Sequence, residues 1–319
     1  MPSLRSPRTR RSAHRARIVV VGDLMLDVVL APERGLEHGS DVPGRVSLAQ
    51  GGSAANTARW LARLGARSSL VCAVGRDPAG RALVDALRGD GVTVRASRLP
   101  AARTGRIGVV VAPGGERSFV ADRGAADLLA AEDLRTDWFR RADAVHLPVY
   151  SLLGDPLGQA GLRAAALGRE AGALVSVDLA SIAPLLAGGR RAAQALIDNV
   201  APDLLFATAA EAEALLGRSS VERLLDHAPV AVVKRGPRGA TVMARDADDH
   251  LRFEVATKHV AATDTTGAGD AFDAGFLVGW FAARSAGGST TAALQRAALA
   301  GHRAAARRLS APRPELPIA

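Results

Sequence analysis

A chain of 319 residues with 48% hydrophobic and 23% charged residues can bury a sizeable core, which excludes a wholly disordered protein. No apolar run approaches 18 residues, so we expect no membrane span, and the single cysteine, Cys72, excludes an intrachain disulfide and a cysteine-cluster metal site. The net charge of +9 suggests nucleic-acid binding, but six arginines and no acid lie in residues 1–17, which leaves +3 for the rest. We therefore expect no nucleic-acid partner and a reducing, cytoplasmic location.

The first elements predict a disordered tail followed by a buried strand. Residues 1–17 are rich in Ser, Pro and Arg and lack apolar periodicity, so we interpret them as a disordered Arg-rich tail. The β-branched run at 18–21 predicts a strand covered on both faces. Asp23 and Asp27 follow it, at the sheet edge where open α/β proteins bind ligands, although Asp23 fits an N-cap or turn role equally well. Residues 31–50 alternate weakly and indicate an irregular β excursion.

The rest of the chain alternates between strand and helix patterns. A helix is predicted with Ser53 as its N-cap and Gly65 as the residue after its end. Two short strands within 104–122 flank a Pro-Gly-Gly turn, and together with 31–50 they predict a small lid sheet. The alternation elsewhere predicts a parallel sheet with right-handed crossovers. These elements are strands at 68–74, 144–147, 174–178, 204–207, 230–234, 240–245 and 251–255, helices at 81–88, 157–171, 191–199 and 209–216, and two last helices that start near Gly269 and Thr290.

The stretch 264–276 reads Asp-Thr-Thr-Gly-Ala-Gly-Asp and then continues with small and apolar residues at helical spacing. Gly267 and Gly269 allow the backbone to approach a ligand closely, so several N–H groups can point at one spot. A helix that starts here adds positive potential, which suits a phosphate or a developing anion. Asp270 would then stand beside an anion hole with a carboxylate able to accept a proton. Taken alone, the pattern fits an ordinary Gly-rich helix entry equally well.

Two patterns more than 200 residues apart resemble the signatures of the ribokinase-like (PfkB) carbohydrate kinases. The N-terminal pattern consists of Gly51, Gly52, Asn56, Ala58, Gly65 and Gly75. The C-terminal pattern consists of Asp264, Gly267, Ala268, Gly269, Asp270 and Gly275. The resemblance covers residues 18–311 and implies a three-layer α/β/α sandwich with a mostly parallel central sheet and a β-sheet lid, followed by a C-terminal tail at 312–319.

The resemblance implies transfer of the γ-phosphate of ATP to a hydroxyl of a small, ribose- or fructose-like carbohydrate, with Mg²⁺ and, as a further candidate, K⁺. Asp270 would be the base, and the amides of Gly267, Ala268 and Gly269 the anion hole. The expected substrate residues are Asp27, Gly51, Gly52, Asn56, Met25, Ser53, Tyr150 and Arg106. The expected nucleotide residues are Lys234, Gly236, Gly239, Thr265, Thr266 and His302, and Glu211 would hold Mg²⁺ through water. Alternatives are a local helix-start bond for Asn56 and solvated side chains for Arg106 and His302.

Departures from the family pattern leave the substrate open. Thr208 replaces the Asn of the Asn-x-x-Glu motif, which would alter metal or phosphate affinity. Met25, Ser53 and Tyr150 replace polar or charged groups of ribokinases, so the pocket is less polar than a free-ribose site. An adenosine-like nucleoside, phosphorylated by the same chemistry, is therefore the alternative substrate.

Two other classes of protein are weighed beside a kinase. A non-catalytic ligand-binding or nucleic-acid-binding protein is disfavoured by the intact pattern at 267–270. A dinucleotide oxidoreductase is excluded because no Gly-x-Gly-x-x-Gly follows the first strand. We also expect an apolar lid face to allow a homodimer.

Overall fold

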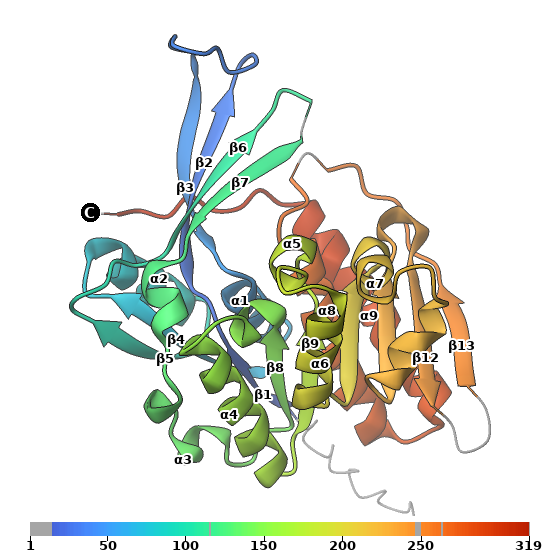
Figure 1. Cartoon of the computed structure of the whole chain (residues 1–319). Helices are drawn as coiled ribbons and strands as arrows, with labels where there is room; N and C mark the ends of the chain where they lie inside the picture. The colour runs from blue at the N-terminus through green and yellow to red at the C-terminus, as the bar shows by residue number, and fades with distance from the viewer. Residues whose placement is uncertain (1–14, 115, 246–249, 263, 319) are drawn as a thin grey trace, which may run out of the picture.

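The computed structural model describes residues 15–114, 116–245, 250–262 and 264–318, and in this part of the chain a nine-stranded sheet has the order β13-β12-β11-β10-β9-β8-β1-β4-β5 (Figure 1). The strands are β1 (Arg17–Val21), β4 (Arg67–Gly75), β5 (Thr93–Leu99), β8 (Ala144–Pro148), β9 (Leu174–Asp178), β10 (Leu204–Thr208), β11 (Val230–Lys234), β12 (Ala240–Arg245) and β13 (His250–Val255). All neighbours from β11 to β5 are parallel, whereas β12 and β13 add in antiparallel fashion at one edge. The predicted mostly parallel sheet is confirmed.

Helices cover both faces of this sheet (Figure 1). One layer contains α1 (Ser53–Arg63), α2 (Pro78–Gly89), α8 (Ala268–Ala286) and α9 (Thr290–Leu309). The other contains α3 (Thr136–Phe139), α4 (Leu157–Glu170), α5 (Ile182–Leu185), α6 (Arg190–Val200) and α7 (Ala209–Leu216). Short 3-10 turns lie at Gly124–Leu128, Ala131–Asp133, Val149–Leu152, Val221–Asp226 and Gly236–Arg238.

Strand β1 shows why its sequence is apolar throughout. Ile18 and Val20 pack into the core on one side of the sheet, and Val19 and Val21 pack into the core on the other. Because both faces are covered, the strand has no polar side, as is usual in parallel sheets. The three-layer α/β/α architecture is thus confirmed.

Small residues bring α8 and α9 close together. A Cβ added at Gly275 would lie 2.7 Å from the carbonyl oxygen of Ala300, and one added at Gly301 would lie 2.9 Å from the ring of Phe272. Such approach is open only to glycine. The tight contact fixes α8, whose first turn carries the residues of greatest chemical interest.

A second, four-stranded sheet projects from the body as the lid (Figure 1). Its order is β3-β2-β6-β7, with β2 (Met25–Pro32), β3 (Gly44–Gly51), β6 (Arg106–Val111) and β7 (Arg117–Asp122). Strands β2 and β6 are parallel, and the other pairs are antiparallel. The first lid strand starts earlier than the predicted 31–50, so Asp27 lies within a lid strand rather than in a strand–helix loop.

Several predicted boundaries are wrong in detail. Arg17 belongs to β1, where its N–H donates to Asp143 Oδ2 at 2.7 Å, so the predicted tail extends too far; residues 1–14 lie outside the described ones. Strand β5 was not predicted, because its arginines and serine interrupt the apolar residues and conceal a strand at the sheet edge. Ser53 is the first residue of α1 and not its N-cap, a position that Gly52 takes.

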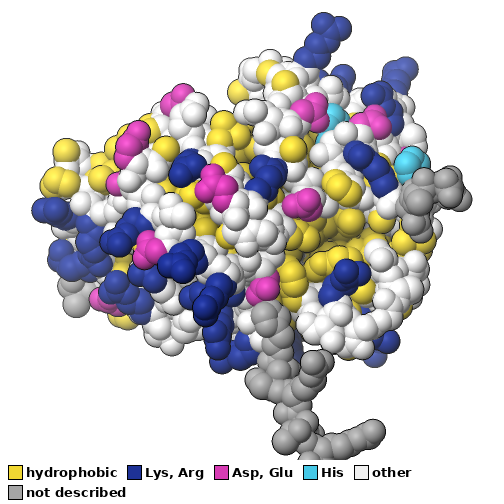
Figure 2. Space-filling model, turned by 90° about the horizontal axis from the view of Figure 1, so that it is seen from below, with side chains coloured by type: hydrophobic (Ala, Val, Ile, Leu, Met, Phe, Trp, Pro, Cys, Tyr) yellow, Lys and Arg dark blue, Asp and Glu magenta, His cyan; other side chains and the backbone are white. Residues whose placement is uncertain are grey.

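The surface seen from below carries Lys and Arg side chains among Asp and Glu side chains and small apolar areas, rather than one continuous basic face (Figure 2). Within the described part of the chain, no helix is long and apolar enough to cross a membrane.

Candidate active site at the start of helix α8

Helix α8 begins directly after a turn with left-handed geometry. Gly267 is the N-cap with φ of 76°, a conformation that favours glycine, and the N–H of Ala268 donates to the carbonyl of Thr265 at 3.2 Å. The following N–H groups belong to the first helical turn, where they have no acceptor within the helix. Together with the helix dipole they create a site suited to an anion.

Asp270 lies in this first turn and is held by two side chains of α1. Ser53 Oγ donates to Asp270 Oδ1 at 2.7 Å, and Asn56 Nδ2 donates to Asp270 Oδ2 at 2.9 Å. Burial outweighs both hydrogen bonds and raises the pKa of Asp270 to about 7. A carboxylate with this pKa can accept a proton near neutral pH. The predicted substrate residues Ser53 and Asn56 therefore also position the predicted base.

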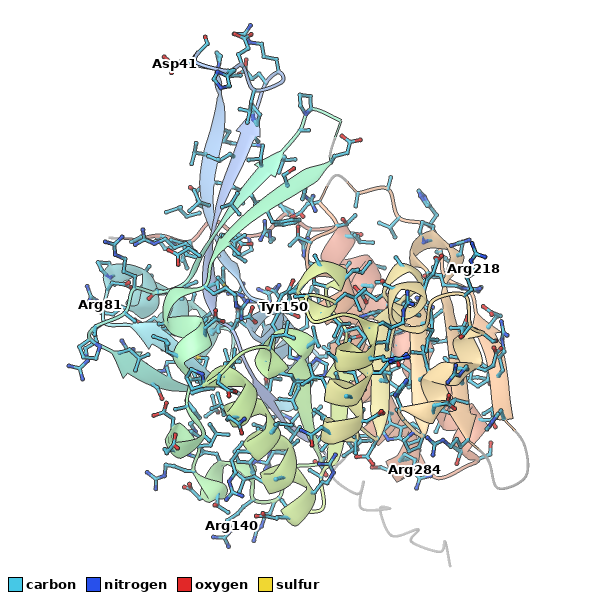
Figure 3. The ribbon with its side chains drawn as sticks, viewed as in Figure 1. Asp41, Arg81, Arg140, Tyr150, Arg218 and Arg284 are labelled. Carbon is cyan, nitrogen blue, oxygen red and sulfur yellow. The ribbon has the colours of Figure 1, made fainter. Side chains whose placement is uncertain are left out.

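Two pockets meet at this helix start. The first, here called the lid pocket, has a volume of about 810 Å³ and lies between the lid and the carboxyl ends of the strands. Its wall includes Asp23, Asp27, Asn56, Ile107, Phe119, Arg123, Tyr150, Asp178, Glu211 and Gly267. Tyr150 lies below the lid, near the middle of the molecule (Figure 3).

The second pocket, here called the helix pocket, has a volume of about 720 Å³. It is lined by Ala209, Arg235, Gly236, Pro237, Arg238, Thr257, Val260, Thr265, Phe272, His302 and Leu309, among others. Thr208, Lys234 and Gly269 line both pockets. Two ligands, one in each pocket, would thus meet at the first turn of α8.

Gly51, the last residue of β3, and Gly52, the N-cap of α1, allow close approach of Asp27 and Asp23. A Cβ at Gly51 would lie 1.8 Å from Asp27 Oδ1, and a Cβ at Gly52 would lie 2.5 Å from the carbonyl oxygen of Asp23. The side chain of Asp23 is itself held, since its Oδ1 accepts the N–H of Ala54 at 3.0 Å. Asp23 therefore shows both of the roles that the sequence suggested, because it accepts an N–H at the start of α1 and also lines the lid pocket.

Arg123 is a pocket residue that sequence reasoning missed. Its Nε donates to Asp127 Oδ1 at 2.5 Å and its Nη1 to Asp23 Oδ2 at 3.3 Å, while its guanidinium lies 5.0 Å from the ring centre of Tyr150. Arg106, which was predicted instead, is exposed on β6 and is not among the described residues that line the lid pocket. The sequence contained a clue to this residue, because Arg123 directly follows the last lid strand.

Met25 lies below the lid pocket rather than in its wall. It is fully buried at the start of β2, and Arg123 Nη1 lies 3.9 Å from its sulfur. Met25 therefore packs in the core beneath the pocket side chains. It does not line the pocket, contrary to the predicted substrate contact.

Lys234 occupies the floor between the two pockets. Its Nζ donates to Asp178 Oδ1 at 2.8 Å and to Asp273 Oδ2 at 3.0 Å. Burial opposes its charge, but Asp178 and Asp273 more than compensate and raise the pKa of Lys234. A Cβ at Gly269 would lie 3.4 Å from Nζ, so the ammonium lies directly under the predicted anion hole.

The remaining predicted nucleotide residues lie mainly around the helix pocket. Gly236 and Gly239 have positive φ in the turn after β11, but only Gly236 is among the described residues that line this pocket. His302 is half-buried, with Nε2 3.1 Å from the carbonyl oxygen of Val255 and its ring 5.1 Å from Phe272. Burial lowers the pKa of His302, so it is neutral at pH 7. The alternative of a solvated His302 is wrong.

Three arginines converge on Asp264 at the start of the Gly-rich turn. Arg117 of β7 lies 3.0 Å from Oδ1, and Arg308 of α9 lies 2.6 Å from Oδ2. Arg313, which follows α9, lies 3.3 Å from Oδ2. Burial opposes ionisation, but the hydrogen bonds from Arg308 and from the N–H of Thr266 lower the pKa of Asp264 to about 2. The side chain of Arg117 also donates to Thr266 Oγ1 at 2.8 Å.

Thr208 and Glu211 form a reciprocal cap at the start of α7. The N–H of Thr208 donates to Glu211 Oε2 at 2.7 Å, and the N–H of Glu211 donates to Thr208 Oγ1 at 3.2 Å. Within the described residues no cluster of three or more His, Cys, Asp or Glu side chains could hold a metal ion. The carboxylate of Glu211 at the wall of the lid pocket fits an outer, water-mediated contact to Mg²⁺ that keeps its waters and is bound mainly by nucleotide phosphates.

Comparison with known proteins places this geometry in context. Residues 15–315 match the profile of a family described as pfkB family carbohydrate kinase. Fructokinase-1 from Oryza sativa subsp. japonica is 34% identical over 272 residues, which cover 82% of each chain. The structure of adenosine kinase from Sinorhizobium meliloti superposes with a TM-score of 0.78 at 25% identity and covers 94% of this chain and 96% of that one. A double mutant of fructokinase from Vibrio cholerae O395, with fructose, ADP and potassium bound, gives a TM-score of 0.75 at 25% identity and covers 94% of each chain.

Proposed function

Because this chain belongs to the pfkB family of carbohydrate kinases, we propose that its acceptor is fructose or a closely similar sugar. Membership of this family makes the chain an ATP-dependent phosphotransferase that acts on a sugar hydroxyl. The similarity to rice fructokinase-1 supports this choice. The observation that carries the proposed mechanism is the position of Asp270, a carboxylate with a pKa of about 7 where the lid pocket and the helix pocket meet.

In this mechanism ATP occupies the helix pocket and the sugar occupies the lid pocket. Asp270 takes the proton from the attacking hydroxyl, and Ser53 and Asn56 keep its carboxylate oriented. The first-turn amides from Gly267 to Gly269 stabilise the charge on the transferring phosphoryl group, a task in which positioned donors matter most.

Mg²⁺ that arrives with ATP would neutralise charge on the nucleotide phosphates, with Glu211 as an outer partner through water. Lys234 lies under the phosphoryl site in ion pairs with Asp178 and Asp273, so its charge is balanced locally and is not free to bind a phosphate. A K⁺ requirement stays a prediction; equal turnover in KCl and NaCl would contradict it.

A nucleoside is the second candidate acceptor. The lid pocket has an apolar side formed by Ile107, Phe119, Tyr150 and Leu153, which has room for a planar ring. The similarity to the adenosine kinase from Sinorhizobium meliloti favours the same reading. The two acceptors differ in the balance of polar and apolar contacts that the pocket must offer.

Steady-state turnover with ATP and a panel of sugars and nucleosides separates these acceptors. We expect fructose to give the highest kcat/KM of the panel. Preference for adenosine or another nucleoside over every sugar would contradict the sugar assignment. The Asp270→Asn variant is the control for background hydrolysis, because it should bind nucleotide and not transfer phosphate.

Two further expectations concern assembly and location. We propose a homodimer through the lid, supported by the exposed side chains of Val46 and Val120, whose exposed fractions are 62% and 73%. Sedimentation of a Val120→Asp variant tests it, and an unchanged oligomeric state would contradict it. A cytoplasmic location is supported by the free, buried thiol of Cys72.

A further inference from the structure

The segment after α9 is part of the site and not a loose tail. It runs from the end of α9 beneath the lid, where the N–H of Leu316 donates to the carbonyl of Leu48 at 2.8 Å (Figure 1). The side chain of Leu316 is buried, and Ile318 packs against the same core. These contacts hold the backbone after Arg313 and the end of α9 holds it before, contrary to the tail predicted at 312–319.

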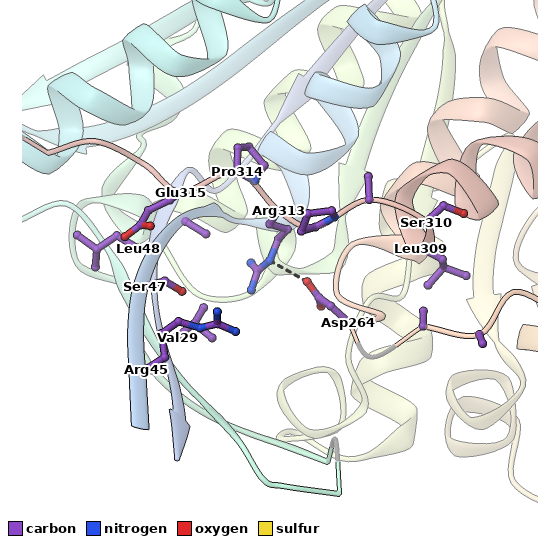
Figure 4. A pocket seen from close by; sticks show the side chains of 15 residues that line it. Val29, Arg45, Ser47, Leu48, Asp264, Leu309, Ser310, Arg313, Pro314 and Glu315 are labelled. Carbon is purple, nitrogen blue, oxygen red and sulfur yellow. Dashed lines mark hydrogen bonds and ion pairs between the residues drawn. The ribbon is translucent and has the colours of Figure 1, made fainter. Parts of the chain in front are cut away.

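Arg313 bridges two carboxylates that belong to different parts of the site. Its Nη1 donates to Asp27 Oδ2. Its Nε donates to Asp264 Oδ2 at 3.3 Å, and Figure 4 shows this second pair. The Arg313 side chain is only 15% exposed, so water screens these ion pairs weakly. One guanidinium thereby joins a lid strand to the turn that precedes α8.

Asp27 has one oxygen engaged and one unused. The residue is 3% exposed and lines the lid pocket. Its Oδ2 is bound by Arg313, whereas its Oδ1 is buried against Gly51 without a hydrogen-bond partner among the described residues. A buried acceptor in this condition is costly, and a small turn of the carboxylate that brings Oδ1 to a donor in the pocket would remove the cost.

Arg313 also opposes the local tendency of Asp27 to become neutral. Burial and the nearby carboxylates of Asp23 and Asp264 all disfavour its charge, and Arg313 is the group that acts against them. Without the guanidinium, Asp27 would take up a proton or turn away, and it would then be a poor acceptor for a substrate hydroxyl.

We propose that Arg313 is a positioning residue for the acceptor sugar: it holds Asp27 by Oδ2 and leaves Oδ1 to accept a hydrogen bond from a sugar hydroxyl. This inference rests on the proposed kinase activity. It assigns a role in substrate affinity to a residue that belongs to neither of the two sequence patterns at 51–75 and 264–275.

The first test is Arg313→Gln, which removes the charge and keeps the side chain polar. Loss of a charged hydrogen bond to Asp27 should raise the KM for fructose by about 10- to 100-fold. The KM for ATP should stay within about twofold, because Arg313 does not line the helix pocket in the described residues. Arg307→Gln, a matched change at an exposed arginine of α9, should change neither constant.

The second test is a double-mutant cycle with Asp27→Asn. If Arg313 acts through Asp27, the double variant should have about the same fructose KM as Asp27→Asn alone. Additive effects would overturn the inference. Arg313→Lys should recover part of the affinity, since it restores the positive charge without the bridging geometry.

Other outcomes separate the inference from the proposed function. In one outcome, the wild type turns over fructose while Arg313→Gln shows an unchanged or lower fructose KM. That result would overturn the role of Arg313 and leave the kinase assignment intact. A lower KM would mean that the guanidinium obstructs the sugar. Equal increases in both KM values together with a lower Tm would indicate a structural role only. A wild-type enzyme inactive on every sugar would overturn the proposed function itself, and this inference with it.

Discussion

Replacing Asp270 with Asn is expected to stabilise the folded protein above pH 7 while it abolishes phosphoryl transfer. Burial raises the pKa of Asp270 to about 7 in the folded chain, whereas an unfolded aspartate has a pKa of about 4. Between these values the folded state binds more protons than the unfolded state. The free energy of unfolding therefore falls as pH rises through this window, and the full cost is present above pH 7. Asparagine does not ionise and carries none of this cost.

The size of the effect follows from the same pKa difference. About three units correspond to about 4 kcal/mol at 1.36 kcal/mol per unit, and we expect roughly half of this because the carboxylate borders an open pocket. The local hydrogen bonds survive the change. The amide oxygen of Asn can accept from Asn56, and its NH₂ group can donate to the hydroxyl of Ser53, which is able to accept.

Urea unfolding of the nucleotide-free protein at pH 5 and pH 8 measures this effect. We expect Asp270→Asn to gain about 2 kcal/mol at pH 8 and about a third of that at pH 5, where most of the titration of the folded state has yet to occur. Turnover should fall by about 10² or more. Asp85→Asn, at an aspartate that is 70% exposed, is the control and should show no such pH dependence. A gain that is equal at both pH values, or a loss at pH 8, would refute the reasoning.

Further measurements address the rest of the site. The kcat/KM of the wild type should rise with pH through about 7 and then level off, because only ionised Asp270 accepts a proton; a flat profile between pH 5.5 and 8.5 would contradict the assigned base. Lys234→Met should lower the free energy of unfolding by about 3–5 kcal/mol, since it leaves the buried Asp178–Asp273 pair without its ammonium partner, and a loss under about 1 kcal/mol in urea unfolding would contradict this charge pairing. Gly51→Ala should raise the fructose KM by about tenfold, because the new methyl group displaces the carboxylate of Asp27. Gly89→Ala, at a position where nothing lies within 4 Å, is the kinetic control. Equal fructose KM values in both variants would argue against the contact.

The sequence predicted the elements whose signal is local. The apolar runs of the buried strands and the Gly-rich turn before Asp270 depend on neighbouring residues only, so pattern and propensity locate them. The alternation of strands and helices then predicted the layered fold. Strand β5 was missed because this edge strand carries Arg95 and Arg98 and lacks the apolar run of the central strands.

The pairings within the site could not be predicted, because they join residues far apart in the chain. Ser53 looks like an N-cap in its local sequence, and only the approach of α1 to α8 makes it a donor to Asp270. Lys234 is the last residue of a strand in a typical strand–turn pattern, and its two carboxylate partners come from other elements. Arg313 carries no local signal at all, since its role depends on the path of the chain after α9.

The two pockets share few residues, and this has a consequence for how such an enzyme can acquire a new acceptor. Thr208, Lys234 and Gly269 line both pockets, whereas Ile107 and Phe119 of the lid line the lid pocket. Mutations in the lid strands can therefore reshape the lid pocket, the proposed acceptor site, while the helix pocket and the first turn of α8 keep their structure. Laboratory evolution that is restricted to the lid should then change acceptor preference with little loss of ATP affinity. The similarity of this one chain to proteins named fructokinase and adenosine kinase agrees with this expectation.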